Sequence, residues 1–349
     1  MIEVQIEKSF GSFHLNVEFS AGNEVLALLG GSGSGKSMTL RAIAGVETPD
    51  RGRIVVDDIV FFDSERHINL TPQQRQVGLL FQNYALFPTM TVLQNIMTGV
   101  RTGTKAQKRQ VALKALERFE LSGLGDRTPG QLSGGQQQRA ALARILVGQP
   151  RILMLDEPFS ALDSHLRDQM EQEVLAIIRD FAGTTLLVSH SRDEVFRMAQ
   201  RVAVYHSGHI DALDEKHALF RDPKTYRAAL LTGCKNFSRI SRCTTTQGQT
   251  RFHADDWDLD CSLDGTHSGQ VAGIRGHHIE LACAPGPNTF SLEVSDIIED
   301  TFEYVLLLRR PGHTGPAIHW MLPKSVYPAP PQGTVMVRFP QESLMLLEP

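Results

Sequence analysis

The fold is decided by the stretch Gly30-Gly31-Ser32-Gly33-Ser34-Gly35-Lys36-Ser37, which fits the phosphate-loop pattern G-x-x-x-x-G-K-[S/T]. The apolar run before it, residues 25–29, predicts a buried strand, and residues 38–44 after it predict a helix. A glycine-rich loop in this position can turn its backbone N–H groups around polyphosphate oxygens, with the positive end of the helix dipole behind them. The sequence therefore predicts a nucleotide site.

Two side chains of this loop are predicted to contact the nucleotide directly. Lys36 is placed to reach the β- and γ-phosphates, and the hydroxyl of Ser37 is placed to ligate Mg²⁺. The aromatic residues Phe10 and Phe13 lie upstream, among short strands predicted within residues 1–65. Either ring can stack on a nucleobase or pack in the core, and we favour Phe10 for stacking.

Polar side chains follow two more predicted strands. Gln82 comes after the apolar segment 77–81, and its amide oxygen can ligate Mg²⁺ or position water; a polar loop residue is the alternative. The apolar segment 152–155 ends in Asp156 and Glu157. Two carboxylates at the end of a buried strand are costly without a cation. We predict that Asp156 holds Mg²⁺ and that Glu157 acts as general base on water.

Two further motifs extend the predicted site. His190 directly follows the buried strand predicted over 184–189, in the same register as the carboxylates, which makes it a catalytic candidate. The sequence Leu132-Ser133-Gly134-Gly135-Gln136 precedes a helix predicted over 137–147. Ser133 is a suitable N-cap, and the two glycines expose backbone N–H groups, so this helix start is a second candidate anion site.

Length, charge and composition limit the alternatives. The 349 residues predict two domains, and the net charge of −4 gives no basis for a nucleic-acid partner. We find no secretory signal and no apolar stretch near the roughly 20 residues of a membrane-spanning helix, so any membrane role is expected to be peripheral. The four cysteines form no C-x-x-C pair, and we expect buried reduced thiols at Cys234, Cys243, Cys261 and Cys283.

The last third of the chain has a different character. Helical patterning fades after residue 231, and short alternating segments follow at 270–274, 278–281, 304–308 and 334–339. They predict a small all-β domain, barrel-like in form, over residues 232–349.

Together, these residues resemble the ATP-binding-cassette (ABC) transporter ATPases over about the first 230 positions. The resemblance implies an α/β P-loop fold over residues 1–231, with a RecA-like core and a helical subdomain at about 85–148. ATP and Mg²⁺ are the implied cofactors. The motifs that carry the resemblance are Walker A (Gly30 to Ser37), the glutamine loop (Gln82), the signature (Leu132 to Gln136), Walker B (Ile152 to Asp156) with Glu157, the D-loop (Ser160-Ala161-Leu162-Asp163) and the switch histidine (His190).

The family's mechanism implies several partners. Two chains pair head to tail as a homodimer, so that Ser133, Gly134, Gly135, Gln136 and Asp163 serve the neighbour's nucleotide. The segment Gln82–Met90 resembles the surface of bacterial importers that receives a separate permease, two copies of which are implied. An extracytoplasmic solute-binding protein and a peripheral location at the cytoplasmic face of the membrane follow from the same resemblance.

The transported solute is predicted from the tail. Residues 232–236 resemble the molybdate and sulfate importer subgroup, and the all-β tail resembles its regulatory domain of oligomer-binding-fold type, although Gly276 stands where a proline is usual. Molybdate is the first candidate, sulfate or tungstate follow closely, and iron(III), sugar or polyamine import is the alternative. Arg275, His277 and His278 are candidate oxyanion ligands or exposed loop residues. A DNA-repair or translation-type cassette is disfavoured, because the chain has neither a coiled-coil insertion nor a second Walker A.

Overall fold

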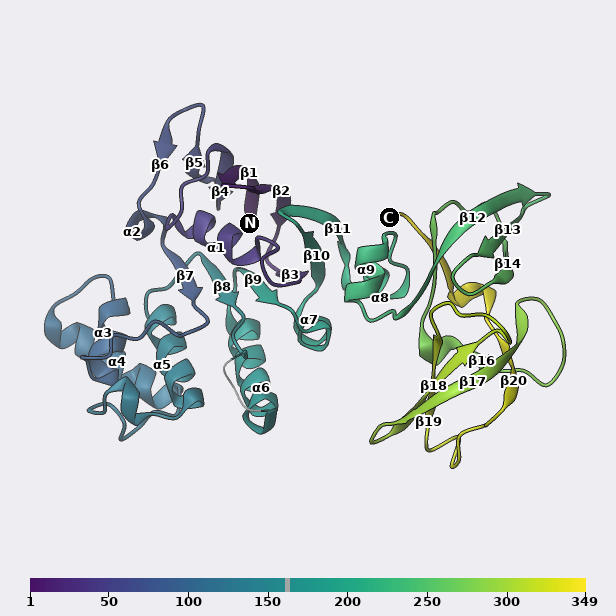
Figure 1. Ribbon diagram of the computed structural model, residues 1–349. Helices are drawn as coiled ribbons and strands as arrows, with labels where there is room; N and C mark the ends of the chain where they lie inside the picture. Colours follow the sequence, from purple (N-terminus) through teal and green to yellow (C-terminus); the bar gives the residue numbers. More distant parts are fainter. Residues whose placement is uncertain (161–163) are drawn as a thin grey trace. The chain divides into compact units, whose positions relative to one another are not determined.

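The computed structural model describes residues 1–160 and 164–349, and the side chains outside 161–166. The chain divides into two compact units, Met1–Lys216 and His217–Pro349 (Figure 1). The domain boundary predicted after residue 231 therefore lies inside the second unit, and it stays a prediction. No helix in the described part of the chain is long and apolar enough to cross a membrane.

An antiparallel sheet forms the outer part of the first unit. In its strand β1, Ile2, Val4 and Ile6 are buried while Glu3 and Gln5 are exposed, the alternation expected when one face of a sheet covers a core and the other faces water. The strands lie in the order β2-β1-β4-β5-β6. They are β1 (Ile2–Phe10), β2 (Phe13–Ala21), β4 (Arg51–Val56), β5 (Ile59–Asp63) and β6 (Ile68–Asn69).

A six-stranded sheet carries the motifs. Its strand order is β11-β10-β3-β9-β8-β7, and the five strands from β10 to β7 are parallel. Every residue of β3, β8 and β9 is buried, as expected for central strands covered on both faces. The carboxyl ends of these parallel strands meet at one edge. The strands are β3 (Val25–Gly30), β7 (Val77–Leu80), β8 (Ile152–Asp156), β9 (Thr184–Ser189), β10 (Arg201–His206) and β11 (His209–Glu215).

The helices of the first unit fall into two groups. Figure 1 shows α3, α4 and α5 gathered below β7, away from α1. They form the helical subdomain predicted at about 85–148. The helices are α1 (Lys36–Ala44), α2 (Pro72–Arg75), α3 (Val92–Gly99), α4 (Lys105–Arg118), the 3₁₀ turn η1 (Pro129–Gln131), α5 (Gly134–Leu146), α6 (Ser164–Asp180) and α7 (Arg192–Met198).

The second unit consists of two five-stranded sheets that share one core. The core holds Trp257 from the first sheet region together with Trp320 and Val337 from the second. Trp320 donates its indole N–H to the carbonyl of Ile279 at 2.8 Å. The first sheet has the order β14-β13-β12-β15-β21 and the second β16-β20-β17-β18-β19. The predicted fold class, an α/β P-loop unit followed by an all-β region, is confirmed.

The bounds of the second unit's elements are as follows. The helices and turns are α8 (Lys216–Arg221, which begins at the unit boundary), α9 (Tyr226–Leu231), η2 (Gly276–His278) and η3 (Gln341–Ser343). The strands are β12 (Asn236–Thr246), β13 (Gln249–Ala254), β14 (Leu259–Asp264), β15 (Val271–Ile274), β16 (Glu280–Leu281), β17 (Thr289–Glu299), β18 (Glu303–Arg309), β19 (Ile318–Pro323), β20 (Thr334–Arg338) and β21 (Leu344–Leu347).

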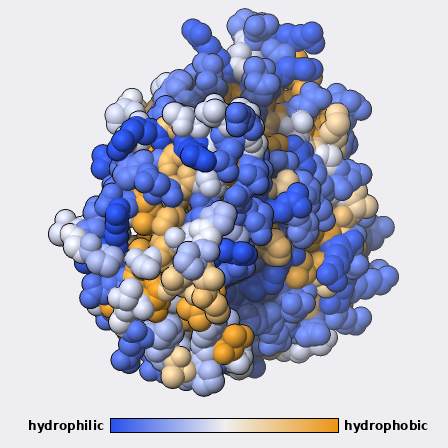
Figure 2. Space-filling view, turned by 90° about the vertical axis from the view of Figure 1, so that its right-hand side faces the viewer, coloured by the Kyte–Doolittle hydropathy of each residue, from blue (hydrophilic) through white to orange (hydrophobic). Residues whose placement is uncertain are grey.

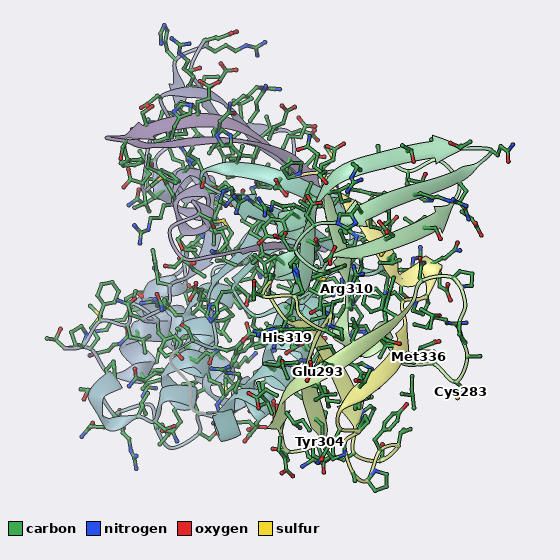
Figure 3. All side chains as sticks on the ribbon, turned by 45° about the vertical axis from the view of Figure 1, so that its right-hand side comes forward. Cys283, Glu293, Tyr304, Arg310, His319 and Met336 are labelled. Atoms are coloured by element: carbon green, nitrogen blue, oxygen red, sulfur yellow. The ribbon has the colours of Figure 1, made fainter. Side chains whose placement is uncertain are left out.

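Two sequence predictions about the tail were wrong in detail. The strand predicted at 278–281 is the turn η2 followed by the two-residue strand β16. Cys234 and Cys261 are buried as predicted, but Cys243 and Cys283 are exposed. Cys243 lies on the part of β12 whose residues are all exposed, and Cys283 lies in the loop after β16 (Figure 3).

Candidate nucleotide site

The phosphate loop connects β3 to α1 and depends on two of its glycines. Gly35, the N-cap of α1, has φ +106°, a conformation that only glycine adopts readily. A Cβ atom there would lie 2.7 Å from Cδ1 of Leu15. A Cβ atom at Gly30 would lie 2.6 Å from the carbonyl oxygen of Tyr205. The loop is therefore packed tightly against β2 and β10, and side chains at these two positions would displace it.

The side chain of Lys36 is buried inside the loop. Its Nζ donates to the carbonyl oxygens of Gly30 at 2.9 Å and Gly31 at 2.7 Å, and to Oγ of Ser34 at 3.3 Å. Burial lowers the pKa of the Lys36 ammonium, while the carboxylates of Glu157 and Asp156 oppose that change. A buried cation that the loop itself holds only through neutral oxygens is suited to receive the negative oxygens of a polyphosphate.

Ser37 and Asp156 form the candidate magnesium site. Oγ of Ser37 donates to Oδ1 of Asp156 at 2.8 Å, so two oxygen ligands from α1 and β8 lie side by side. Burial is the main cause that raises the pKa of the Asp156 carboxyl, and the hydrogen bond from Ser37 opposes it. A buried carboxylate beside a hydroxyl gains stability from a bound divalent cation, and hard oxygen ligands are those that Mg²⁺ prefers. The residues present fit Mg²⁺.

Gln82 lies at the same edge of the sheet. The predicted strand 77–81 ends one residue early, at Leu80, and Gln82 is exposed in the turn that follows. Leu80 is paired with Leu155 in the parallel β7–β8 ladder, so the carboxyl end of β7, which Gln82 follows, lies beside that of β8. Its role as a magnesium ligand stays a prediction.

Glu157 and His190 form an adjacent pair. Oε2 of Glu157 lies 3.4 Å from Nδ1 of His190. Glu157 has φ +47°, and its N–H donates to the carbonyl of Val188 at 3.0 Å, so the backbone is turned sharply where β8 ends. The carbonyl of Glu157 accepts a hydrogen bond from the hydroxyl of Ser160 at 2.9 Å. A carboxylate held in this way can accept a proton from water, and the imidazole beside it can hydrogen-bond to a neighbouring polar group.

The loop that bears His190 is fixed by a residue that the sequence analysis missed. Oγ of Ser189 donates to Oε2 of the buried Glu194 at 2.6 Å and accepts from the N–H of Ser191 at 2.9 Å. Ser191 in turn caps α7 through the N–H of Glu194. The spacing S-x-x-E is typical of a capping box and could have identified Glu194 from the sequence.

The signature motif begins α5, as predicted. Oγ of Ser133 accepts from the N–H of Gln136 at 3.3 Å, and Oε1 of Gln136 accepts from the N–H of Ser133 at 3.1 Å. Among the described residues, no hydrogen bond joins this motif to the phosphate loop. The N-terminus of α5 and that of α1 are therefore two separate candidate anion sites in one chain.

The remaining predicted residues have different surroundings. Phe10 is 38% exposed, with Nζ of Lys8 at 5.2 Å from its ring centroid. Phe13 packs against the buried core, and its Cζ would lie 3.2 Å from a Cβ atom at Gly35. The exposed ring of Phe10 is thus the better face for a nucleobase, which stays a prediction. Asp163 lies outside the described residues.

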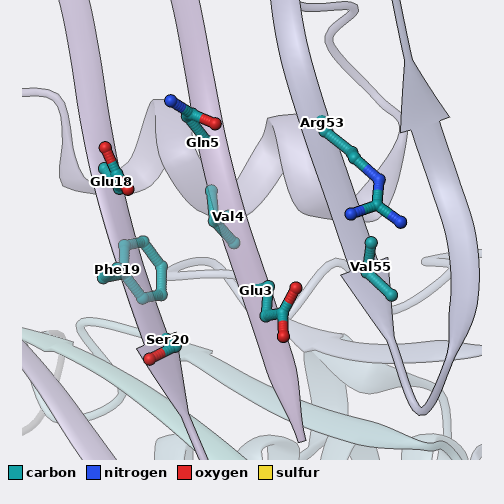
Figure 4. A pocket seen from close by; sticks show the side chains of 8 residues that line it. All are labelled: Glu3, Val4, Gln5, Glu18, Phe19, Ser20, Arg53 and Val55. Atoms are coloured by element: carbon teal, nitrogen blue, oxygen red, sulfur yellow. The ribbon is translucent and has the colours of Figure 1, made fainter.

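A hollow of about 370 Å³ on the antiparallel sheet is not part of this site. Figure 4 shows it between β1, β2 and β4, where the charged side chains of Glu3, Glu18 and Arg53 line it. None of the predicted site residues lies there. Because both signs of charge are present on an open sheet face, it has the composition of ordinary solvated surface.

The fold and the site define a P-loop nucleotide-hydrolysing protein with a helical subdomain and a second candidate anion site at a helix N-terminus. Comparison with known proteins gives the same result. The family model described as "ABC transporter" matches residues 13–160. The dimeric post-hydrolysis structure of the ATP-binding cassette MJ0796 with ADP and Pi is similar to this chain with a TM-score of 0.53 and 27% identity, covering 62% of this chain and 99% of that one.

Curated relatives match over longer stretches. The sulfate/thiosulfate import ATP-binding protein CysA of Synechococcus elongatus is 36% identical over 302 residues, covering 84% of this chain and 81% of that protein. The molybdenum import ATP-binding protein ModC of Paramagnetospirillum magneticum is 39% identical over 293 residues, covering 82% and 80%. The spermidine/putrescine import ATP-binding protein PotA of Bacillus cereus is 39% identical over 237 residues, covering 66% and 70%. The chain belongs to the ABC transporter family and is an ATP-hydrolysing transporter subunit.

Proposed function

We propose that this chain powers the import of a small oxyanion through a separate membrane permease, with molybdate as the first candidate and sulfate or tungstate close behind. The extent of the similarity carries this proposal. Matches to one CysA and one ModC span 302 and 293 residues and so reach well into the second unit. A second CysA, a second ModC and PotA match over 238, 212 and 237 residues, so the support comes from the long matches alone. Polyamine import remains the second candidate, and iron(III) or sugar import the outside alternative.

In the proposed mechanism, the phosphate loop binds ATP and Lys36 contacts the β- and γ-phosphates. Ser37, Asp156 and Gln82 would hold Mg²⁺, which neutralises charge on the phosphate oxygens when bound. The carboxylate of Glu157 accepts a proton from the attacking water, and His190 orients toward the γ-phosphate. The ring of Phe10 stacks on the adenine.

Two chains are needed to complete each site. In the proposed homodimer, Ser133 and the backbone N–H groups of Gly134 and Gly135 bind the γ-phosphate held by the partner chain, with Gln136 and Asp163 beside it. The N–H groups of both glycines lack hydrogen-bond partners among the described residues, which supports this assignment. Closure by ATP and opening after hydrolysis would move two permease subunits docked at Gln82–Met90. A solute-binding protein would deliver the oxyanion from outside, and the chain itself would work at the cytoplasmic face of the membrane.

One face of the protein and the segment Gln82–Met90 bear on the proposed peripheral role. On the face shown in Figure 2, apolar side chains form small separate patches among hydrophilic ones, without a broad apolar band. The one exposed aromatic side chain of the segment Gln82–Met90 is Phe87, which is 47% exposed. An exposed aromatic ring in a short loop is a common anchor for a partner protein.

The second unit would sense the oxyanion, but Arg275 is not the exposed loop residue that was the alternative to a ligand. Arg275 is buried, and its guanidinium donates to the carbonyls of Thr232 at 2.7 Å and Phe220 at 2.6 Å, where it fastens the ends of α9 and α8. The carbonyls at helix C-termini lack donors within the helix, and the guanidinium of Arg275 supplies donors to them. His277 is exposed and His278 is half-buried.

The test is steady-state ATPase activity of the purified full chain, titrated separately with molybdate, tungstate, sulfate, spermidine and iron(III). We expect saturable inhibition by molybdate or tungstate, and a weaker effect of sulfate. Saturable inhibition by spermidine or iron(III) alone would contradict the oxyanion assignment. A chain without ATPase activity under any condition would contradict the assignment of the catalytic residues.

A further inference from the structure

The loop after β7 contains two strained residues next to each other. Tyr84 has φ +59° and Ala85 has φ +45°, so two consecutive non-glycine residues adopt the left-handed conformation. Side chains with a Cβ atom disfavour this conformation, and it persists only where surrounding contacts hold it. The pair begins two residues after Gln82, in the segment proposed to receive the permease. The contacts that hold this turn therefore also position Gln82.

Arg144 supplies those contacts from α5. Its Nη1 donates to the carbonyl of Ala85 at 2.7 Å and its Nη2 to the carbonyl of Tyr84 at 3.1 Å. The guanidinium carbon also lies 5.7 Å from the ring centroid of Phe87. Within the described part of the chain, Arg144 has no carboxylate partner. The guanidinium of Arg144 therefore contacts the strained turn through its hydrogen bonds and lies beside the exposed ring of Phe87.

The far end of the same segment is fastened to α3. Asn95 is fully buried, and its Oδ1 accepts from the N–H of Phe87 at 2.8 Å. Its Nδ2 donates to the carbonyls of Phe87 at 3.1 Å and Met90 at 3.2 Å. Phe87 is therefore held by two polar side chains: Asn95 of α3 bonds to its backbone, and Arg144 of α5 lies beside its ring.

We propose that Arg144 is a positioning residue that joins the turn after Gln82 to the signature motif. Ser133 caps the N-terminus of α5, and Arg144 lies near the other end of this 13-residue helix, roughly 16 Å away along the axis. Because a helix of this length moves as one body, a force applied at Phe87 displaces Ser133 and Gln82 together. The inference rests on the proposed function, since it uses the permease site and the head-to-tail dimer.

The experiment compares Arg144→Met and Arg144→Lys with the matched control Arg139→Met in the full chain that also carries Glu157→Gln. Arg139 lies on the same helix but bonds to Glu120 at 2.9 Å, away from the turn. Three quantities are measured: ATP affinity of the monomer, the dissociation constant of the ATP-bound dimer, and amide hydrogen exchange over residues 82–90. The ATP affinity of the monomer tests whether the phosphate loop is intact. The dissociation constant of the ATP-bound dimer tests whether the signature motif is correctly placed.

We expect Arg144→Met to leave ATP affinity within about twofold of the parent, to weaken the dimer about tenfold, and to raise amide exchange over residues 82–90 about tenfold. Arg144→Lys should give the same pattern, because an ammonium cannot form the two-pronged contact. Adding Ala85→Gly to Arg144→Met should recover about fivefold of both losses, since glycine removes much of the left-handed penalty. A general loss of stability would not be reversed in this way.

The inference is overturned if Arg144→Met leaves either the dimer or the exchange unchanged. It is also overturned if Arg139→Met has equal effects, or if Ala85→Gly restores nothing. These outcomes differ from a failure of the proposed function, which would show as a parent chain that does not form an ATP-dependent dimer at all.

Discussion

Replacement of Arg75 by methionine tests whether the phosphate-loop helix is held at its far end. Arg75 is fully buried, and its Nη1 donates to the carbonyls of Ala42 at 2.6 Å and Ile43 at 2.9 Å. These are among the last carbonyls of α1, where the carbonyl of Ala42 also accepts from the N–H of the C-cap Gly45 at 3.2 Å. Since the N-terminus of α1 carries Lys36, the guanidinium anchors the element that presents the candidate phosphate site.

The expected loss of stability follows from the bonds and the burial. Nε of Arg75 also donates to the carbonyl of Leu70 at 2.9 Å and Nη2 to Oδ1 of Asn69 at 2.8 Å, which makes four hydrogen bonds from one charged group. At about 1.5–3 kcal/mol each, they contribute roughly 6–12 kcal/mol. Burial lowers the pKa of Arg75 to about 10 from 12.5, which offsets about 3 kcal/mol of this.

The difference is roughly 3–9 kcal/mol. We expect Arg75→Met to lower the free energy of unfolding of the first unit by about 3–5 kcal/mol, the lower part of this range, because that is the usual cost of removing one partner of a buried charged interaction. Arg75→Lys should cost about half as much, because three ammonium donors cannot reproduce the planar fork. Methionine keeps the volume of the side chain, so little of the loss should come from an empty cavity.

The chain contains an internal control for this measurement. Both tryptophans, Trp257 and Trp320, lie in the core of the second unit. In urea titrations, tryptophan fluorescence therefore reports the second unit alone, while circular dichroism reports both units. The fluorescence transition should stay in place when the first-unit transition moves to lower urea. A first-unit change below about 1 kcal/mol would refute the reasoning, because solvated surface substitutions give values of that size.

Two further predictions concern the catalytic base and the thiols. Glu157→Gln should leave ATP binding intact, lower ATP turnover at least about 100-fold and trap an ATP-bound dimer, because only proton transfer is lost; normal turnover in this variant would contradict the role of Glu157. Burial raises the pKa of Cys234 to about 11 and of Cys261 to about 12, so these thiols stay protonated at pH 8. Because the thiolate is the nucleophile, both cysteines should resist alkylation at that pH. Mass spectrometry of the native chain should show two fast adducts, at the exposed Cys243 and Cys283, and of the unfolded chain four.

The sequence predicted those features that depend on local spacing. The pattern of residues 25–44 predicts a strand, a glycine-rich loop and a helix in that order. The structure confirms them as β3, the phosphate loop and α1. Ser133 was predicted as an N-cap because serine is favoured at that position before a helix. The structure confirms the cap and adds the reciprocal hydrogen bond from Gln136. The pairing of Ser37 with Asp156 is less local, yet it follows from the shared edge of parallel strands.

Features that depend on distant burial were not predictable in this way. An arginine in a helical segment usually belongs to a solvated face, and nothing in the spacing around Arg75 or Arg144 indicates that each is folded inward. Arg275 was considered as an oxyanion ligand because the tail resembles a regulatory domain, but it is buried against two helix ends. The partners of these arginines are backbone carbonyls, which carry no signal in the sequence.

Arg75, which is buried, and Arg144, which is half-buried, fasten two separate parts of the candidate site. Each anion-binding helix carries its nucleotide motif at the N-terminus and is fastened near the other end. Arg75 fastens α1 to the segment between β6 and α2, whereas Arg144 fastens α5 to the loop that carries Phe87. On the proposed function, a permease pressing on this loop shifts the signature while the phosphate loop stays with its sheet. In the proposed dimer, each nucleotide lies between one chain's phosphate loop and the other chain's signature. Such a relative shift would therefore change the geometry at the γ-phosphate without altering the residues that bind the rest of ATP.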